Sequence, residues 1–183
     1  MRGIKTRMQR LTPKKYPYQR ISEERMKTMQ DILFNQKILT VYCDFSGNNK
    51  TNYLGIAACF VGNGNTFVES TRIYGRNPKE TALGELLAVF FAVKTLPVIL
   101  ERYRVFLNKP TKIYIYSDYV QIENIQSIDF KKQEYIKVTS ELIANLNQLR
   151  ERFNWCDISI KYLGEEKKQN IYHKAAHRAS RKA

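Results

Sequence analysis

The strongest constraint on the fold is a run of three strand-like segments, residues 38–45, 52–61 and 66–74, separated by turn residues. The segments are rich in β-branched and aromatic side chains, which favour a pleated sheet. Between the second and third segments, the sequence Gly-Asn-Gly-Asn at residues 62–65 is a strong signal for a tight hairpin turn. We therefore expect three consecutive strands that pair antiparallel.

After the third strand, helix and strand patterns alternate. A largely apolar helix is expected to begin at Asn77-Pro78 and to end or kink at Pro97. The later segments are, in order, a buried strand at 112–117, an amphipathic helix at 132–153, a strand at 157–163 and a basic helix at 170–182. The order βββ-α-β-α-β-α predicts an α/β fold with a mixed five-stranded sheet, three antiparallel strands followed by parallel ones, flanked by helices.

The charge of the chain points to a polyanionic partner. Its 183 residues include 31 Lys and Arg against 17 Asp and Glu, a formal net charge of +14. Such an excess favours nucleic acid or an anionic membrane surface, and composition alone does not choose between them.

Residues 1–36 differ in composition from the rest of the chain. They include nine basic and three acidic residues. Pro13 and Pro17 favour an extended backbone there, before a short helix that opens at Ser22. We predict a basic N-terminal arm over residues 1–36 that contacts nucleic acid, and one folded domain over residues 37–183. A solvated, disordered tail is the alternative for the arm.

Cysteine usage and the apolar runs bear on the cellular compartment. Cys43, Cys59 and Cys156 form no C-x-x-C pair and are odd in number, which argues against a disulfide framework or a cysteine zinc site. The basic start is not followed by the apolar run of a secretory signal. The apolar stretch at 82–100 is interrupted by charges and a proline, which argues against a membrane span. We expect a cytoplasmic protein.

Three acidic residues lie in segments that are otherwise apolar: Asp44 in a strand, Glu85 in the apolar helix and Asp118 at the end of a buried strand. A buried carboxylate needs a partner or a metal ion. Tyr42-x-Asp44 and Tyr116-x-Asp118 share a local pattern, so adjacent parallel strands would place both carboxylates at the same end of the sheet. A structural salt bridge is the alternative for any one acid, whereas the three together suggest Mg²⁺ or Mn²⁺.

These residues resemble the motifs of the ribonuclease H-like superfamily, and most closely those of type 1 ribonuclease H, over about residues 37–183. The motifs that match are Asp44-Phe45-Ser46-Gly47, Glu85-Leu86-Leu87-Ala88 and Ser117-Asp118-Tyr119. The resemblance implies a ribonuclease H-like fold and a metal-dependent endonuclease that hydrolyses the RNA strand of RNA–DNA hybrids. It implies two Mg²⁺ or Mn²⁺ ions, with Asp44 bridging them and Glu85, Asp118 and a fourth ligand completing the site.

The fourth ligand departs from the family pattern. The family has an acid in its last helix, and the corresponding segment here, residues 169–176, has His173 at that position. Some members of the superfamily complete the site with histidine, so the resemblance implies that His173 is the fourth metal ligand. His177, one turn further along the helix, could replace it. The other interpretation is that His173 is a polar helix residue and the site is inactive.

Two further departures concern the substrate. The loop at residues 164–168 lacks the histidine that helps product release in the family, and Glu165 is the candidate to replace it. Thr81-Ala82 stands where the family has the Asn pair that reads the RNA 2′-hydroxyl. The alternatives are therefore a DNA or branched-structure nuclease of the same fold, or an inactive nucleic-acid-binding protein.

The predicted partner is nucleic acid, and the resemblance implies an RNA–DNA hybrid. We expect no membrane, no small-molecule cofactor and a monomeric state. The residues predicted to contact nucleic acid are Lys14, Lys15, Ser46, Thr81, Lys167, Lys168 and Arg178.

Overall fold

The computed structural model describes residues 22–47, 53–75, 77, 79–102 and 109–183. Its centre is a five-stranded sheet in the order β3-β2-β1-β4-β5. The first three strands, β1 Ile38–Gly47, β2 Tyr53–Gly62 and β3 Asn65–Tyr74, pair antiparallel. The last two, β4 Lys112–Ser117 and β5 Asp157–Tyr162, run parallel to β1. The predicted mixed sheet is confirmed.

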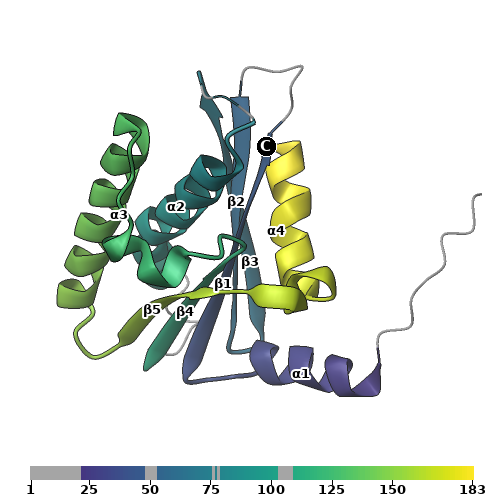
Figure 1. Cartoon of the computed structure of the whole chain (residues 1–183). Coiled ribbons are helices and arrows are strands. Elements are labelled where there is room, and N and C mark those ends of the chain that lie inside the picture. Colours follow the sequence, from purple (N-terminus) through teal and green to yellow (C-terminus); the bar gives the residue numbers. More distant parts are fainter. Residues whose placement is uncertain (1–21, 48–52, 76, 78, 103–108) are drawn as a thin grey trace, which may run out of the picture.

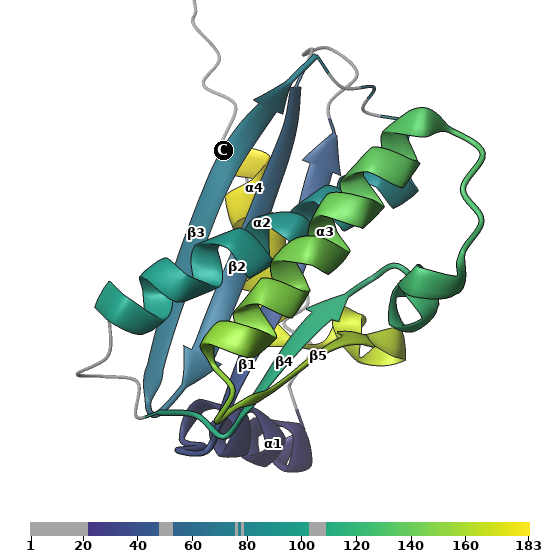
Figure 2. The ribbon, with the colours of Figure 1, turned by 90° about the vertical axis from the view of Figure 1, so that its left-hand side faces the viewer.

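Helices cover both faces of the sheet (Figure 1). Figure 2 shows α2, Thr81–Arg102, and α3, Gln133–Arg152, in front of the strands, with α4, Ile171–Lys182, behind them. Near one end of the sheet lies α1, Glu23–Leu33. Two short 3₁₀ helices follow strand ends: η1 Ile122–Ser127 precedes α3, and η2 Gly164–Lys168 precedes α4.

Side-chain alternation along β1 divides the core between the two faces of the sheet. Val41 and Cys43 face α2 and belong to the larger apolar cluster. Tyr42 faces the opposite side and packs with Tyr172 and Ala176 of α4. By the same alternation, Asp44 belongs to the face that α4 covers. The sheet therefore presents this carboxylate to the last helix.

The short hairpin between β2 and β3 forms as its sequence predicts. Asn63 and Gly64 have φ angles of 50° and 76°. Two consecutive residues with positive φ are the signature of a type I′ turn, whose twist matches that of the flanking strands. The turn therefore fixes the register of β2 against β3.

The apolar helix α2 differs from the prediction at both ends. It begins at Thr81 rather than Pro78, because the Asn77 side chain accepts a hydrogen bond from the Lys79 amide and forms a turn before the helix. Pro97 does not end it, since the helix continues to Arg102. Burial of apolar side chains on both sides of Pro97 offsets the backbone hydrogen bond that proline removes.

Among the described residues, α2 is also the one helix whose length and apolar composition would suffice to cross a membrane. Core helices of folded domains share these properties, and α2 packs between the sheet and α3.

Part of the predicted N-terminal arm contacts the domain. Ser22 caps α1, and the backbone at Leu33 and Asn35 accepts hydrogen bonds from the β2–β3 turn at 2.7 and 2.8 Å. The Tyr172 hydroxyl donates to the carbonyl of Met29 at 2.8 Å. The rest of the arm, including the predicted nucleic-acid contacts Lys14 and Lys15, lies outside the described residues. The division of the chain at residue 37 stays a prediction.

Candidate metal centre

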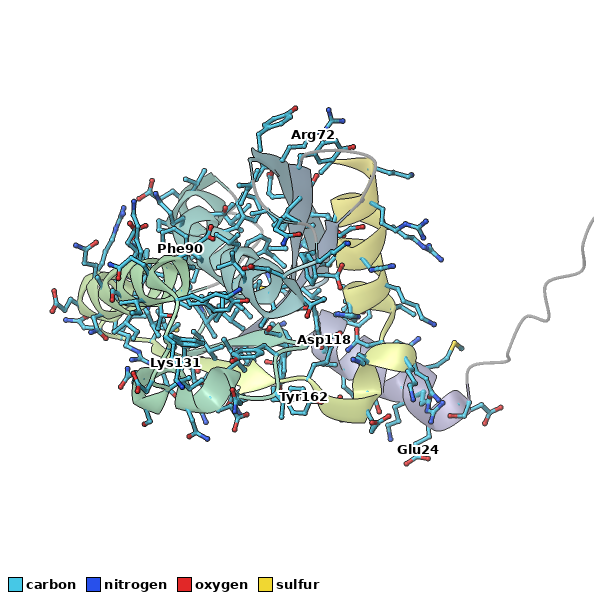
Figure 3. The ribbon with its side chains drawn as sticks, turned by 45° about the horizontal axis from the view of Figure 1, so that its top comes forward. Glu24, Arg72, Phe90, Asp118, Lys131 and Tyr162 are labelled. Atoms are coloured by element: carbon cyan, nitrogen blue, oxygen red, sulfur yellow. The ribbon has the colours of Figure 1, made fainter. Side chains whose placement is uncertain are left out.

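Two carboxylates, those of Asp44 and Asp118, lie close together near the carboxyl ends of the neighbouring strands β1 and β4. Strands β1 and β4 are neighbours and parallel, and Tyr42 lies opposite Tyr116 in their register. Asp44, still within β1, and Asp118, directly after the end of β4, are each two residues further along and therefore lie side by side. Asp44 is 5% exposed, and Asp118 lies near the centre of the view in Figure 3, beside α4.

The first turn of α4 adds an imidazole. The Asn170 side chain caps this helix and accepts hydrogen bonds from the backbone amides of Tyr172 and His173, both at 3.0 Å. The cap fixes the turn that bears His173, whose Nε2 lies 3.5 Å from Asp44 Oδ1 and 3.6 Å from Asp118 Oδ1. His173 is buried, so the sheet edge and the helix enclose the three side chains.

Asp44, Asp118 and His173 fit a divalent cation. One donor atom from each lies within 4.8 Å of the other two. Within the described part of the chain, His173 Nε2 and Asp118 Oδ1 are buried and have no hydrogen-bond partner. Buried polar atoms without partners are costly, and a cation between them would satisfy both. Carboxylate oxygens with one imidazole suit first-row divalent ions such as Mn²⁺.

The protonation of His173 favours this role. Burial lowers the pKa of His173, and the two nearby carboxylates only partly oppose the shift. The imidazole is therefore neutral at neutral pH. Neutral imidazole is the form that binds a metal ion.

Glu85 lies beside this group but does not join it. Its Oε2 accepts a hydrogen bond from Ser117 Oγ at 3.3 Å, and the Tyr119 amide donates to the same Ser117 hydroxyl at 3.2 Å. Burial, with repulsion from Asp44 and Asp118, raises the pKa of Glu85 to about 8. The sequence prediction named Glu85 and missed Ser117, although a serine that ends a buried strand just before Asp118 was a possible signal.

The second oxygen of Asp44 is held by α4. Asp44 Oδ2 lies 3.0 Å from His177 Nδ1 and accepts a hydrogen bond from Ser180 Oγ at 2.9 Å. Burial raises the pKa of Asp44, and His173, His177 and Ser180 limit the rise. His177 was predicted as a possible replacement for His173, whereas here both contact Asp44. Ser180 was missed, although it follows His173 at the i+7 spacing of one helix face.

Two glycines allow the helices to approach the site. A Cβ atom at Gly55 in β2 would lie 1.8 Å from the carbonyl oxygen of Ser180 in α4. A Cβ atom at Gly84 in α2 would lie 2.3 Å from the ring of Phe45 in β1. Only glycine fits at such close contacts. Gly55 therefore lets α4 bring Ser180 to Asp44, and Gly84 lets α2 approach β1 next to Glu85.

The 3₁₀ helix η2 places Lys167 at the site. Lys167 Nζ donates a hydrogen bond to Asp118 Oδ2 at 3.2 Å. Glu165, the candidate to replace the missing loop histidine, has an exposed side chain that pairs with Lys168 at 3.2 Å. The loop residue that reaches the carboxylates is therefore Lys167, which the sequence predicted only as a contact to nucleic acid.

The other predicted nucleic-acid contacts lie at the surface or beside the carboxylates. Ser46 is half-buried two residues after Asp44, and Thr81 is exposed at the start of α2, one turn before Glu85. Lys168 and Arg178 are exposed.

The sheet order with helices on both faces is the ribonuclease H-like fold. The resemblance inferred from the sequence is thus confirmed at the level of the fold. Comparisons by sequence add nothing to this, because no protein-family model and no curated protein match the chain.

The solved structures similar to this chain include three ribonucleases H. The N-terminal RNase H domain of a Mycobacterium tuberculosis protein has a TM-score of 0.54 and 14% identity, covering 80% of this chain and 95% of that one. RNase H1 from the halophilic archaeon Halobacterium salinarum has a TM-score of 0.53 and 15% identity, covering 80% and 99%. LC11-RNase H1, isolated from compost, has a TM-score of 0.55 and 16% identity, covering 80% and 97%.

LC11-RNase H1 has also been solved in complex with an RNA/DNA hybrid. That structure matches with a TM-score of 0.54 and 16% identity, and covers 79% of this chain and 97% of the other.

Proposed function

We propose that this protein is a divalent-cation-dependent endonuclease that hydrolyses the RNA strand of RNA–DNA hybrids. The observation that carries the proposal is the convergence of Asp44, Asp118 and His173, with unpartnered buried atoms, at the sheet edge of a ribonuclease H-like fold. The hybrid complex of LC11-RNase H1 and the net charge of +14 support nucleic acid as the partner.

The residues that would hold a cation are Asp44, Asp118 and His173, with Glu85 next to them. A divalent cation held there would activate water and stabilise the leaving oxygen of a phosphodiester. The resemblance in sequence implies two Mg²⁺ or Mn²⁺ ions. The cytoplasmic location and the monomeric state stay predictions.

Neighbouring side chains orient these ligands. Asn170 fixes the turn that bears His173, Ser180 and His177 fix Asp44, and Ser117 fixes Glu85. Residues that hydrogen-bond to metal ligands set the ligands' orientation and basicity. The arrangement is therefore pre-organised before any substrate binds.

Glu85 holds a proton at neutral pH when no cation is bound. Burial and the charges of Asp44 and Asp118 raise its pKa to about 8. A cation near these carboxylates would favour the ionised form, because opposite charges attract. Cation binding at this site would therefore release a proton from Glu85.

A cleavage assay tests the proposal. Purified protein is incubated with a hybrid, an RNA duplex, a DNA duplex and a DNA junction of matched sequence, in Mg²⁺ and in Mn²⁺. We expect cleavage of the RNA strand of the hybrid, with Mn²⁺ at least as effective as Mg²⁺, because imidazole is a softer ligand than carboxylate. Asp44→Asn should abolish cleavage and serves as the control for contaminating nucleases. Absence of cleavage with every substrate would contradict the proposal.

A second candidate is a DNA or junction nuclease of the same fold. It is favoured by Thr81, which starts α2 where the resemblance places the residues that read the 2′-hydroxyl. Cleavage of the DNA duplex or junction, with the hybrid left intact, would select this candidate.

A further inference from the structure

The oxygens of Asp44 and Asp118 divide into two sets. Asp44 Oδ2 is engaged by His177 and Ser180, and Asp118 Oδ2 accepts a hydrogen bond from Lys167. The remaining oxygens, Asp44 Oδ1 and Asp118 Oδ1, both face His173 Nε2. The carboxylate atoms open to a cation therefore form one group, around one position.

Lys167 contacts the Asp118 oxygen that does not face His173. Its Nζ atom lies 3.2 Å from Asp118 Oδ2, and its side chain is 38% exposed, against 17% for Asp118. Lys167 also interacts electrostatically with Glu85. A second divalent ion held by Asp118 and Glu85 would have to displace this ammonium group or bind against its charge.

The backbone on both sides of η2 supports this placement of Lys167. Gly164, with a φ of 66°, turns the chain out of β5, and the amides of Gln169 and Asn170 donate to the carbonyl of Glu166. Asn170 is also the residue that caps α4 and orients His173. The ammonium group and the imidazole are therefore positioned by one continuous segment.

We propose that this site binds a single divalent cation, through Asp44 Oδ1, Asp118 Oδ1 and His173 Nε2. The Lys167 ammonium group supplies the second positive charge, beside Asp118 and Glu85. The role of this charge in hydrolysis depends on the nuclease function proposed above, whereas the number of ions bound does not. The inference replaces the second ion implied by the sequence resemblance with a side chain of the protein.

The chemistry of an ammonium group suits this position. Lysine is a compact positive charge with three N–H donors. Next to Asp118, it can donate a hydrogen bond to a phosphate oxygen of a bound strand while one donor remains on the carboxylate. It would thereby neutralise charge on the phosphate without a second metal ion.

A Mn²⁺ titration of the full chain without nucleic acid tests this inference. Free Mn²⁺ is followed by its electron paramagnetic resonance signal, which gives the number of ions bound per chain. We expect one ion for the wild type and two for Lys167→Met, because removing the positive charge frees Asp118 Oδ2 and Glu85 for a second ion. Lys167→Arg keeps the charge and should again bind one ion.

Lys168→Met is the matched control. It removes the same charge from the neighbouring residue of η2, whose side chain pairs with Glu165 at the surface. It should bind one ion, as the wild type does. His173→Ala should lose the single site, with Mn²⁺ affinity weakened by about 100-fold or more.

Each outcome separates the inference from the proposed function. Two ions bound by the wild type, one ion bound by Lys167→Met, or no binding at all would overturn the inference. The cleavage assay then decides the nuclease function independently. One ion bound without cleavage of any substrate would overturn the function and leave the ion count standing.

Discussion

Both oxygens of Asp44 face the same side of α4. His173 faces Oδ1, and His177 and Ser180 contact Oδ2. Residues seven apart on a helix lie two turns apart on the same side. The orientation of this carboxylate therefore depends on His177 and Ser180, each of which makes a single contact with Oδ2.

Ser180→Ala should weaken Mn²⁺ binding by about 10- to 100-fold, because partners that orient a metal ligand contribute that much to affinity. The Ser180 hydroxyl is 2.9 Å from Asp44 Oδ2 and buried. The measurement is a calorimetric Mn²⁺ titration. Ser140→Ala, on the exposed side of α3, is the control and should bind as the wild type does. If Ser180→Ala and the wild type bound Mn²⁺ with equal affinity, Ser180 would have no role in orienting the metal ligands.

Glu85→Gln should change how stability depends on pH in the absence of metal. A folded-state pKa of about 8, against an ordinary value of 4.5, means that the folded state keeps a proton that the unfolded state has lost. The contribution of Glu85 to the free energy of unfolding therefore falls as pH rises from about 4.5 to 8, at up to about 1.4 kcal/mol per pH unit.

Glutamine does not titrate, so the Glu85→Gln protein should lose less stability over the same range. Urea denaturation at pH 5 and pH 8 in the presence of EDTA measures the difference. Parallel losses in the two proteins would show that Glu85 is not a buried acid with a raised pKa.

The main candidate ligands could be predicted from the sequence because each is an unusual residue in its own segment. Asp44, Glu85 and Asp118 stand out because a carboxylate in an apolar segment is costly unless something compensates it. Ser180 and Ser117 do not stand out, because serine is ordinary in helices and at strand ends. Their roles arise from contacts across 136 and 32 residues of chain, which no local pattern encodes.

At the scale of elements, two close approaches bring helices to the site. The carbonyl of Ser180 in α4 lies over Gly55 of β2, and the ring of Phe45 in β1 lies over Gly84 of α2. The helices thus sit closer to the sheet than any side chain at these two glycines would allow.

Gly55→Ala should therefore push α4 away from the sheet. We expect a loss of about 1–3 kcal/mol in the free energy of unfolding, the usual cost of forcing extra volume into a packed contact. Weaker Mn²⁺ binding should accompany it, because His173 moves with α4. Urea denaturation and a Mn²⁺ titration measure the two effects. If Gly55→Ala kept the wild-type free energy of unfolding and Mn²⁺ affinity, the close contact between α4 and β2 at residue 55 would not be needed.

The helices and strands were largely predictable, and the exceptions have structural causes. In the described part of the chain, periodicity and turn signals placed the five strands and four α-helices, and only the ends of α2 differ by more than about two residues. Periodicity does not reveal η1 and η2, because each is only a turn or two long. Pro97 inside α2 shows that packing on both sides of a residue can override its local preference.

At the scale of the whole molecule, a strongly positive chain carries a small cluster of largely buried acids. The chain carries a net charge of +14, while Asp44, Glu85 and Asp118 lie together at the sheet edge. Exposed basic side chains of α4, such as Lys174 and Arg178, lie on the helix that contacts this centre. These basic side chains would attract a polyanion toward the carboxylates.

Hybrid binding should weaken steeply with salt, by about 0.9 log units per log unit of salt for each phosphate contacted. Fluorescence anisotropy of a labelled hybrid in EDTA, between about 50 and 200 mM KCl, measures the slope without cleavage. Arg178→Ala should reduce the slope by about one unit. Arg152→Ala, at the end of α3 on the opposite face of the sheet, is the control. If the affinity of the wild type for the hybrid did not change with salt concentration, a surface that binds phosphates would be excluded.

The site includes side chains from β1, α2, the end of β4, η2 and α4, and α4 follows every strand in the chain. A ribosome therefore finishes the sheet before it releases the helix that bears His173. Until α4 emerges and docks, the nascent polypeptide has two aspartates but no imidazole to enclose them. The three donor atoms of the candidate metal site therefore come together only once α4 has docked on the completed sheet.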